Sequence, residues 1–270
     1  RDRPAQKVRA PMVLEPVQEL AKVEVLPAGG KDKLIMEKRE DGWWLTSPKE
    51  SKLLEAKAKS LNEVFSRKLR ALDVRIPESK AAEYEVSEDK ATKVRAFAKG
   101  ASEPAVELLV GKTFQVQATR ATHTFARVPG EKTIHRLQAD LGFANEKETN
   151  NWRSKKISEA LRKDVTKVTL SRPNAKDVVL TKDGEAFKMV APMEGMKLEQ
   201  SAVDTLLSGG ASLSASGVVD DKSPEDLGLK PPQVRLVAER GEGKEPITLL
   251  FSKQKDKHYA QVEGKPYLYE

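Results

Sequence analysis

Short stretches in which apolar and polar residues alternate run along most of this chain, and a period of two predicts β-strands. In the first half the pattern covers residues 20–26, 34–37, 43–46, 94–98, 106–110, 123–128 and 134–137. In the second half it covers residues 165–170, 178–180, 187–190, 234–238, 247–251, 259–262 and 267–269. Turn residues such as Asp41-Gly42 separate these runs. They favour antiparallel hairpins, because parallel neighbours need long crossover connections.

Apolar residues recur at helical spacing once in each half, which predicts two amphipathic helices. The first set is Leu53, Leu54, Ala58, Leu61, Val64, Phe65, Leu69 and Leu72, with Pro77 beyond its end. The second set is Leu198, Ala202, Val203, Leu206 and Leu207. Gly209 and Gly210 follow it directly, and glycine is a poor helix former. We therefore expect the second helix to be shorter than the first.

The two halves repeat one another. Residues 22–25 correspond to 167–170, residues 41–48 to 183–192, residues 82–86 to 225–229, and residues 125–128 to 259–262. The repeated positions are mostly apolar or turn-forming, so the repetition preserves a fold rather than a reaction site. We predict an α+β fold of two tandem repeats, each a twisted antiparallel β-sheet packed with one main amphipathic helix.

This pattern divides the chain into three parts. Residues 1–17 contain three prolines among basic residues and are predicted to form an extended lead-in. Residues 18–156 form the first repeat, in which the polar residues 138–156 are expected to serve as a connection. Residues 157–270 form the second repeat.

Composition removes several classes of site. The chain has no cysteine, which excludes disulfides, cysteine–zinc sites and cysteine nucleophiles. Its net charge is +7, of which residues 1–135 carry +6 (26 basic and 20 acidic residues) and residues 136–270 carry +1 (22 and 21). The signs are interspersed and no nucleic-acid-binding module is present, so we predict no nucleic-acid partner.

No catalytic, cofactor-binding or metal-binding constellation is evident. His123 and His258 lie near corresponding strand starts, but neither has a nearby cluster of carboxylate ligands in sequence, and His135 is the third histidine. The densest acidic stretch comprises Asp220, Asp221, Glu225 and Asp226, and it lacks the spacing and the central glycine of a calcium loop. Residues 241–243 lack the third glycine of a phosphate loop and predict a hairpin turn. We therefore predict a protein that is not an enzyme and that uses no cofactor and no metal. A hydrolase would need a deep pocket that gathers carboxylates from both repeats.

The adjacent pair Trp43 and Trp44 is the most conspicuous aromatic feature. Neighbouring side chains on a strand point to opposite faces. In the second repeat Phe187 stands in place of Trp43 and Lys188 in place of Trp44. Trp43 is therefore predicted to be the core residue, and Trp44 either faces a partner or packs under the lead-in segment. Exposed tryptophan is enriched at binding hot spots.

Several motifs together resemble the bacterial family called domain of unknown function 4340, in two tandem copies over roughly residues 18–270. They are the stretch at residues 41–48 with the helix after it, the Glu-Asp-Leu-Gly-Leu turn at 225–229 and the closing hairpin at 259–269. Residues 152–157 look like the basic segment that follows each closing strand in this family. The first copy has Glu85 where the family turn has glycine, so the resemblance implies a different turn there.

The resemblance also implies a setting. Members have one N-terminal membrane helix and an extracytoplasmic body, and many are encoded beside ABC transporters of the gliding-motility-associated type. It therefore implies a periplasmic or otherwise extracytoplasmic accessory or scaffold protein. A membrane helix outside this sequence would anchor its N-terminus to the inner membrane. The implied partners are the permease and ATPase subunits of such a transporter.

An alternative function also fits these residues. The basic first half and Trp44 are also compatible with an extracytoplasmic module that binds an acidic glycan or another polymer. Retention on an acidic polymer that weakens with salt would favour this alternative, whereas recovery of transporter subunits with the protein would favour a protein-binding scaffold.

Overall fold

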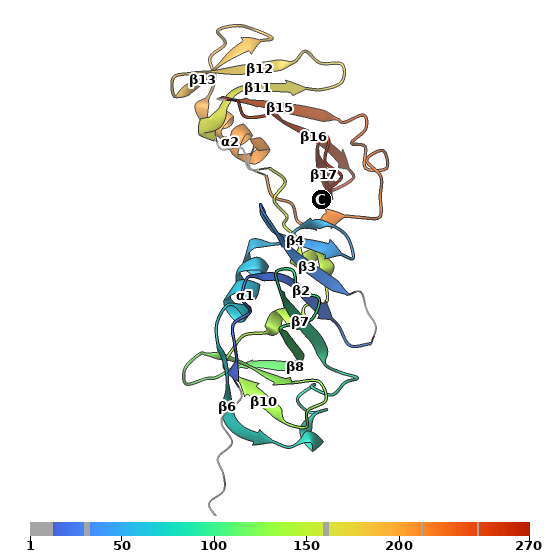
Figure 1. Ribbon diagram of the computed structural model, residues 1–270. Coiled ribbons are helices and arrows are strands. Elements are labelled where there is room, and N and C mark those ends of the chain that lie inside the picture. Colours follow the sequence, from blue (N-terminus) through green and yellow to red (C-terminus); the bar gives the residue numbers. More distant parts are fainter. Residues whose placement is uncertain (1–12, 30–32, 159–161, 212, 242) are drawn as a thin grey trace, which may run out of the picture. The chain divides into compact units, whose positions relative to one another are not determined.

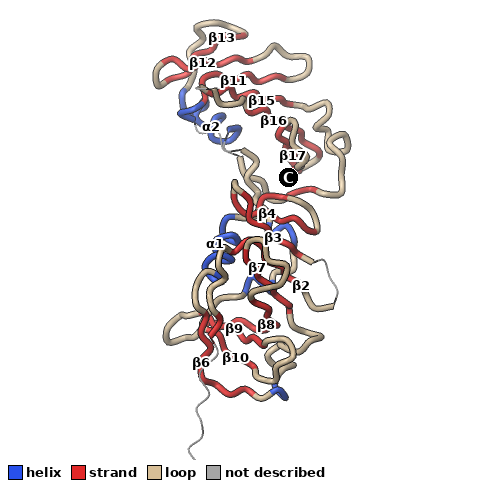
Figure 2. Tube along the Cα trace, viewed as in Figure 1, coloured by secondary structure: helices blue, strands red, loops and turns tan. Residues whose placement is uncertain are grey.

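A computed structural model describes residues 13–29, 33–158, 162–211, 213–241 and 243–270. The chain divides into two compact units, unit 1 (residues 1–154) and unit 2 (residues 155–270). Strands dominate both units (Figure 2), and all strand pairs within them are antiparallel. Within the described residues, each unit has one sheet and one α-helix (Figure 1). Neither described α-helix is long and apolar enough to cross a membrane.

Unit 1 contains a ten-stranded sheet in the order β1-β6-β10-β9-β8-β7-β2-β3-β4-β5. Its strands are β1 (Val13–Leu14), β2 (Leu20–Leu26), β3 (Leu34–Arg39), β4 (Gly42–Ser47), β5 (Ser51–Lys52), β6 (Leu69–Ile76), β7 (Thr92–Ala98), β8 (Val106–Gln115), β9 (Thr122–Arg127) and β10 (Ile134–Leu137). Its helices are α1 (Glu55–Phe65) and the 3-10 turns η1 (Glu78–Lys80), η2 (Gly142–Asn145) and η3 (Thr149–Trp152).

Unit 2 contains an eight-stranded sheet in the order β13-β12-β11-β15-β16-β17-β18-β14. Its strands are β11 (Val165–Ser171), β12 (Val178–Asp183), β13 (Ala186–Ala191), β14 (Val218–Val219), β15 (Val234–Arg240), β16 (Ile247–Gln254), β17 (Lys257–Val262) and β18 (Leu268–Tyr269). Its helices are η4 (Arg162–Asp164) and α2 (Gln200–Ala211).

The two sheets follow the same order of strands. Read from β6 to β4, the sheet of unit 1 runs 6-10-9-8-7-2-3-4, and that of unit 2 runs 14-18-17-16-15-11-12-13, so the strands correspond one to one in chain order. Strands β1 and β5 of unit 1 are additional. Two antiparallel sheet-rich halves with the same topology are consistent with a repeated structure.

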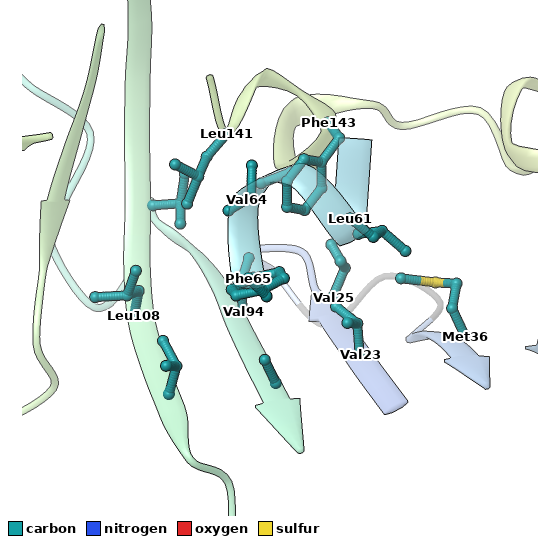
Figure 3. Close-up of a cluster of buried hydrophobic side chains, with 14 of the residues drawn as sticks. Val23, Val25, Met36, Leu61, Val64, Phe65, Val94, Leu108, Leu141 and Phe143 are labelled. Carbon is teal, nitrogen blue, oxygen red and sulfur yellow. The ribbon is translucent and has the colours of Figure 1, made fainter. Parts of the chain in front are cut away.

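One face of each sheet is covered by its helix. In unit 1, α1 buries Leu61, Val64 and Phe65 against the sheet, where Val23 and Leu108 belong to the same apolar cluster (Figure 3). In unit 2, Val203 and Leu207 of α2 belong to the cluster that contains Phe187, Leu236 and Leu249. Burial of this apolar area is what fixes each helix to its sheet.

The first helix is shorter than its apolar pattern predicts. It ends at Phe65, and Leu69 and Leu72 belong to strand β6 instead. Leu69 and Ala71 are buried while Arg70 between them is exposed, which is strand alternation. Pairing of this segment with both β1 and β10 outweighs the helical spacing.

The second helix is longer than predicted. It has 12 residues against 11 in α1, and it continues through Gly209 and Gly210. Each glycine costs a helix interior about 1 kcal/mol relative to alanine. Burial of Val203 and Leu207 in the preceding turns outweighs that cost.

The segment that follows β10 is part of the core of unit 1 rather than a simple connection. Within it, Leu141, Phe143, Ala144 and Trp152 are all buried in the same cluster as α1. Figure 3 shows Phe143 beside Val64 and Leu141 near the strand that carries Leu108. Composition alone hides this role because the segment forms short 3-10 turns without a regular apolar period.

Candidate protein-binding surfaces

Trp44 lies on the outer face of β4 and is half-buried, whereas Trp43 is buried in the core. The indole Nε1 of Trp44 donates a hydrogen bond of 2.8 Å to Asp41 Oδ1. The guanidinium carbon of Arg39 lies 4.8 Å from the ring centroid of Trp44, within cation–π range. The prediction that these two tryptophans face opposite sides of the sheet is confirmed.

Charged groups around Trp44 are paired with one another. Arg39 donates two hydrogen bonds of 3.1 Å to the two carboxylate oxygens of Glu50. These bonds lower the pKa of Glu50 and raise that of Arg39. The hydrogen bond from Trp44 lowers the pKa of Asp41, and Lys52, 3.6 Å away, acts in the same direction. The result is an aromatic ring held in a charge-balanced frame, which we call the Trp44 surface (Arg39, Asp41, Trp44, Glu50 and Lys52).

The three histidines do not form a site. His123 is buried, and its Nδ1 accepts a hydrogen bond of 2.9 Å from Arg136 Nε. His135 Nε2 lies 3.7 Å from Glu131 Oε2. His258 is exposed. Among the residues that the structure describes, no group of three or more histidine, aspartate or glutamate side chains is arranged to hold a metal ion.

The acidic stretch before β15 has a structural role. Asp226 Oδ2 accepts hydrogen bonds from the backbone N–H and the hydroxyl of Ser223, while the Asp226 N–H donates to Ser223 Oγ. These bonds lower the pKa of Asp226. The arrangement is a reciprocal capping box that starts a turn. Glu225 lies 3.5 Å from the ammonium of Lys230.

Unit 1 has a polar pocket of about 440 Å³ between α1 and residues 140–146. Its lining carries charges of both signs, from Lys57, Glu63, Arg67, Asp140 and Glu146. Lys57 Nζ lies 3.9 Å from Glu146 Oε2 and 4.9 Å from the ring centroid of Trp152. Lys57 and Glu146 therefore form an ion pair within the lining.

Unit 2 has a more apolar pocket of about 430 Å³, which sequence reasoning did not find. We call it the β17 pocket; its apolar lining is Ile157, Leu213, Ala215, Phe251, Ala260 and Tyr269. Its polar rim includes His258 and the ion pair between Lys257 and Glu270, whose Nζ–oxygen distances are both 2.8 Å. A pocket of this size lies within the range that ligand sites occupy, roughly 300–1,000 Å³. No sequence motif marks it, because its walls come from five separate stretches of the chain.

Comparison with known protein families gives one match. The sequence profile of the family described as "Domain of unknown function (DUF4340)" matches residues 43–232 in a single stretch that includes parts of both units. No curated protein matches the chain. No solved structure matches it either.

Proposed function

We propose that this chain, which belongs to the DUF4340 family, is a non-enzymatic scaffold that binds other proteins. The Trp44 surface carries the proposal. Its half-buried indole is held in place by Asp41 and Arg39 before any partner arrives. Tryptophan and arginine dominate binding hot spots, and a side chain that is already ordered loses less entropy on binding.

We propose further that the two units are tandem repeats, each packed by one main helix. The strand order that the two sheets share supports this, as do two hydrogen bonds near the ends of the helices. The Val17 N–H donates over 2.8 Å to the carbonyl of Phe65, the last residue of α1, and the Ile157 N–H donates over 2.7 Å to the carbonyl of Leu213, two residues after α2. Duplication of a scaffold gives two related surfaces on which different binding sites can develop.

The proposed setting is the extracytoplasmic face of a membrane, with an N-terminal anchor and an ABC-transporter permease and ATPase as partners. Its basis is the family resemblance, and it is independent of the Trp44 argument. A scaffold of this kind would act by holding subunits together, for which a protein-binding surface is sufficient.

The test is a pull-down of the full-length protein from solubilised membranes, with mass spectrometry of the proteins recovered. We expect transporter subunits with the unmodified protein and a loss of at least tenfold with Trp44→Ala, since loss of a hot-spot side chain costs about 2 kcal/mol or more. The matched control is Lys59→Ala, which removes a side chain that is 75% exposed on α1. Recovery of no transporter subunit would argue against the proposed setting, and equal recovery with Trp44→Ala would argue against the surface.

The alternative partner is an acidic glycan, which the net charge and Trp44 favour. Several described basic side chains of unit 1 are engaged by acidic ones, however. Lys22 and Lys33 lie 3.3 and 3.0 Å from Glu24, and Arg95 lies 3.3 Å from Glu107. A charge-balanced face attracts polyanions weakly. Retention on heparin that falls with salt and with Trp44→Ala would make the glycan the better assignment.

A further inference from the structure

We propose that Arg136, on the face of the unit 1 sheet opposite α1, binds a side-chain carboxylate of a partner protein beside an apolar residue of that partner. This is a second binding site, beyond the Trp44 surface. In the order of the sheet, five strands separate β10, which carries Arg136, from β4, which carries Trp44 (Figure 2). The two surfaces can therefore be tested independently.

The guanidinium of Arg136 is held in one orientation before any ligand binds. Its Nε donates a hydrogen bond of 2.9 Å to Nδ1 of His123, which is 6% exposed. Its central carbon lies 4.8 Å from the ring centroid of Phe114, within cation–π range. Phe114 in turn stacks on Phe125, with centroids 5.1 Å apart. A side chain that is already ordered loses little entropy on binding.

The remaining donors of this guanidinium are available to a ligand. Among the described residues, only His123 accepts a hydrogen bond from Arg136, so the terminal NH2 groups keep their donors. Arg127 of β9 shows the contrast, because it lies 3.7 and 3.8 Å from the carboxylates of Glu78 and Glu88. Arg136 has no such ion pair with any residue in the described ranges.

A second cation lies on the same face. Leu72 of β6 pairs with Arg136, and Arg70 stands two residues before Leu72, so its side chain is on the same side of the sheet. Diagonal neighbours of this kind are about 7–8 Å apart. Arg70 is exposed, and it too has no ion pair within the part of the chain that the structure describes. Two cations without an acidic partner attract an anion.

The surroundings of Arg136 favour a carboxylate beside an apolar group. Across the strands, Arg136 is flanked by Leu72 and Phe125. The planar fork of a guanidinium binds both oxygens of a carboxylate through parallel hydrogen bonds. The further oxygens of a phosphate would lie against Leu72 and Phe125, which donate no hydrogen bond. The same two side chains bury apolar area of a ligand that carries an apolar residue next to its carboxylate.

The experiment is an NMR titration of the isotope-labelled 270-residue chain with the blocked peptide acetyl-Ala-Glu-Leu-Ala-amide. We expect saturable shifts of the Arg136 Nε–H and of the backbone amides of β9 and β10, with a dissociation constant of about 1 mM. The same peptide with glutamine in place of glutamate should bind at least tenfold more weakly, because its neutral amide cannot form the charge-assisted pair.

Two variants separate the planar fork from the charge, and the amides of β9 report binding in both. Arg136→Lys keeps the charge but removes the fork, and should weaken binding at least fivefold. Arg70→Gln, at an exposed position, should weaken it about threefold and provides the test if Arg136→Lys unfolds. The matched control is Lys99→Gln, which removes an exposed cation just after β7 and should change nothing.

Several results would overturn the proposal. They are no saturation up to about 20 mM peptide, equal binding of the glutamate and glutamine peptides, and binding that both arginine variants leave unchanged. Acetate that binds as tightly as the peptide would show an adventitious anion only. Inorganic phosphate that binds tenfold more tightly than the peptide would assign the site to phosphate instead. Trp44→Ala should leave the titration unchanged, so failure here and failure of the Trp44 surface are distinguishable.

Discussion

Glu85 and Gly228 adopt the same left-handed backbone conformation, with φ of 59° and 67°, at equivalent turns of the two units. In unit 1 the Val86 N–H donates to Ala81 O over 2.9 Å, closing the turn. In unit 2 the Leu229 N–H donates to Pro224 O over 2.8 Å. Both are Schellman-type turns, so the expectation that Glu85 implies a different turn is wrong. A glutamate there adopts a conformation that glycine adopts without steric cost.

We predict that Glu85→Gly stabilises unit 1 by about 0.5 kcal/mol. Relief of the left-handed conformation contributes about 1–2 kcal/mol, and the greater freedom of glycine in the unfolded chain removes about 0.5–1 of it. The ion pair with Lys112, 3.9 Å away and half-exposed on both sides, adds little to the balance. Urea unfolding followed by tryptophan fluorescence measures the change.

This readout is specific to unit 1, because Trp43, Trp44 and Trp152 are the only tryptophans of the chain. The control is Glu103→Gly, the same replacement at an exposed residue whose φ is not positive. At Glu103 the replacement adds the conformational freedom of glycine to the unfolded chain and relieves no left-handed conformation, so stability should fall or stay the same. If both replacements destabilise equally, the left-handed conformation of Glu85 carries no strain.

Gly111→Ala should destabilise unit 1 by about 3 kcal/mol, near the upper end of the cost of overpacking. A Cβ at this position would lie 2.1 Å from the carbonyl oxygen of Tyr84 and 2.7 Å from Cγ1 of Val86. The Lys112 N–H also donates to Tyr84 O over 3.0 Å, which holds that backbone in place. The fluorescence-monitored urea midpoint tests this against Lys112→Ala, an exposed neighbour that should cost little. A midpoint at or above that of the unmodified chain would show that the turn is free to move.

The strands and hairpins follow from the sequence because they depend on local signals. Alternation gives β2 its observed bounds, and Asp41-Gly42 marks the hairpin between β3 and β4. The exchange of Trp43 for Phe187 correctly identifies the buried side of both strands. These features are set by period and turn chemistry within a few residues.

The errors depend on distant parts of the chain. Leu69 and Leu72 fit a helical stripe, and only pairing of β6 with β1 and β10 makes them a strand. Burial of the first turns carries α2 across Gly209 and Gly210. His123 and His258 resemble a pair in sequence. The strand register shows that the residue of unit 1 equivalent to His258 is Thr124, not His123. A shift of one residue moves a side chain to the other face of a sheet.

The candidate sites also differ in whether a local sequence signal or the folded structure reveals them. Trp44 is visible in the sequence because an outward tryptophan on a strand is unusual. The β17 pocket cannot be seen in the sequence, because folding brings its lining together from separate stretches of the chain. Its walls include Leu213 and Ala260, which lie far apart in the sequence.

Phe143→Ala should destabilise unit 1 by about 3 kcal/mol, the lower end of the range for buried phenylalanine. The ring is 6% exposed and packs edge-to-face on Phe65 and Trp152, with centroids 6.3 and 6.2 Å away. Phe143 also borders the polar pocket, so water can enter the space that the ring leaves and limit the cost. Urea unfolding measures it, with Phe143→Leu as the conservative control at a smaller loss. An unchanged midpoint would show that residues 138–156 are a simple connection, as the sequence predicts.

The stability of unit 1 should fall as the pH decreases through the titration of His123, because folding holds this imidazole neutral. Burial lowers its pKa, and the nearby charge of Arg136 lowers it further. The hydrogen bond that its Nδ1 accepts from Arg136 also requires an unprotonated nitrogen. A group whose pKa is lowered by folding contributes stability above its unfolded pKa of about 6.5, and that contribution is lost as the pH falls through the folded value. Fluorescence-monitored urea unfolding at several pH values between 8 and 5 should show a loss in the unmodified chain that His123→Gln reduces, since glutamine still accepts from Arg136 but does not titrate. His258→Gln, in unit 2, should leave the loss unchanged, and an equal loss in all three proteins would mean that other groups cause it.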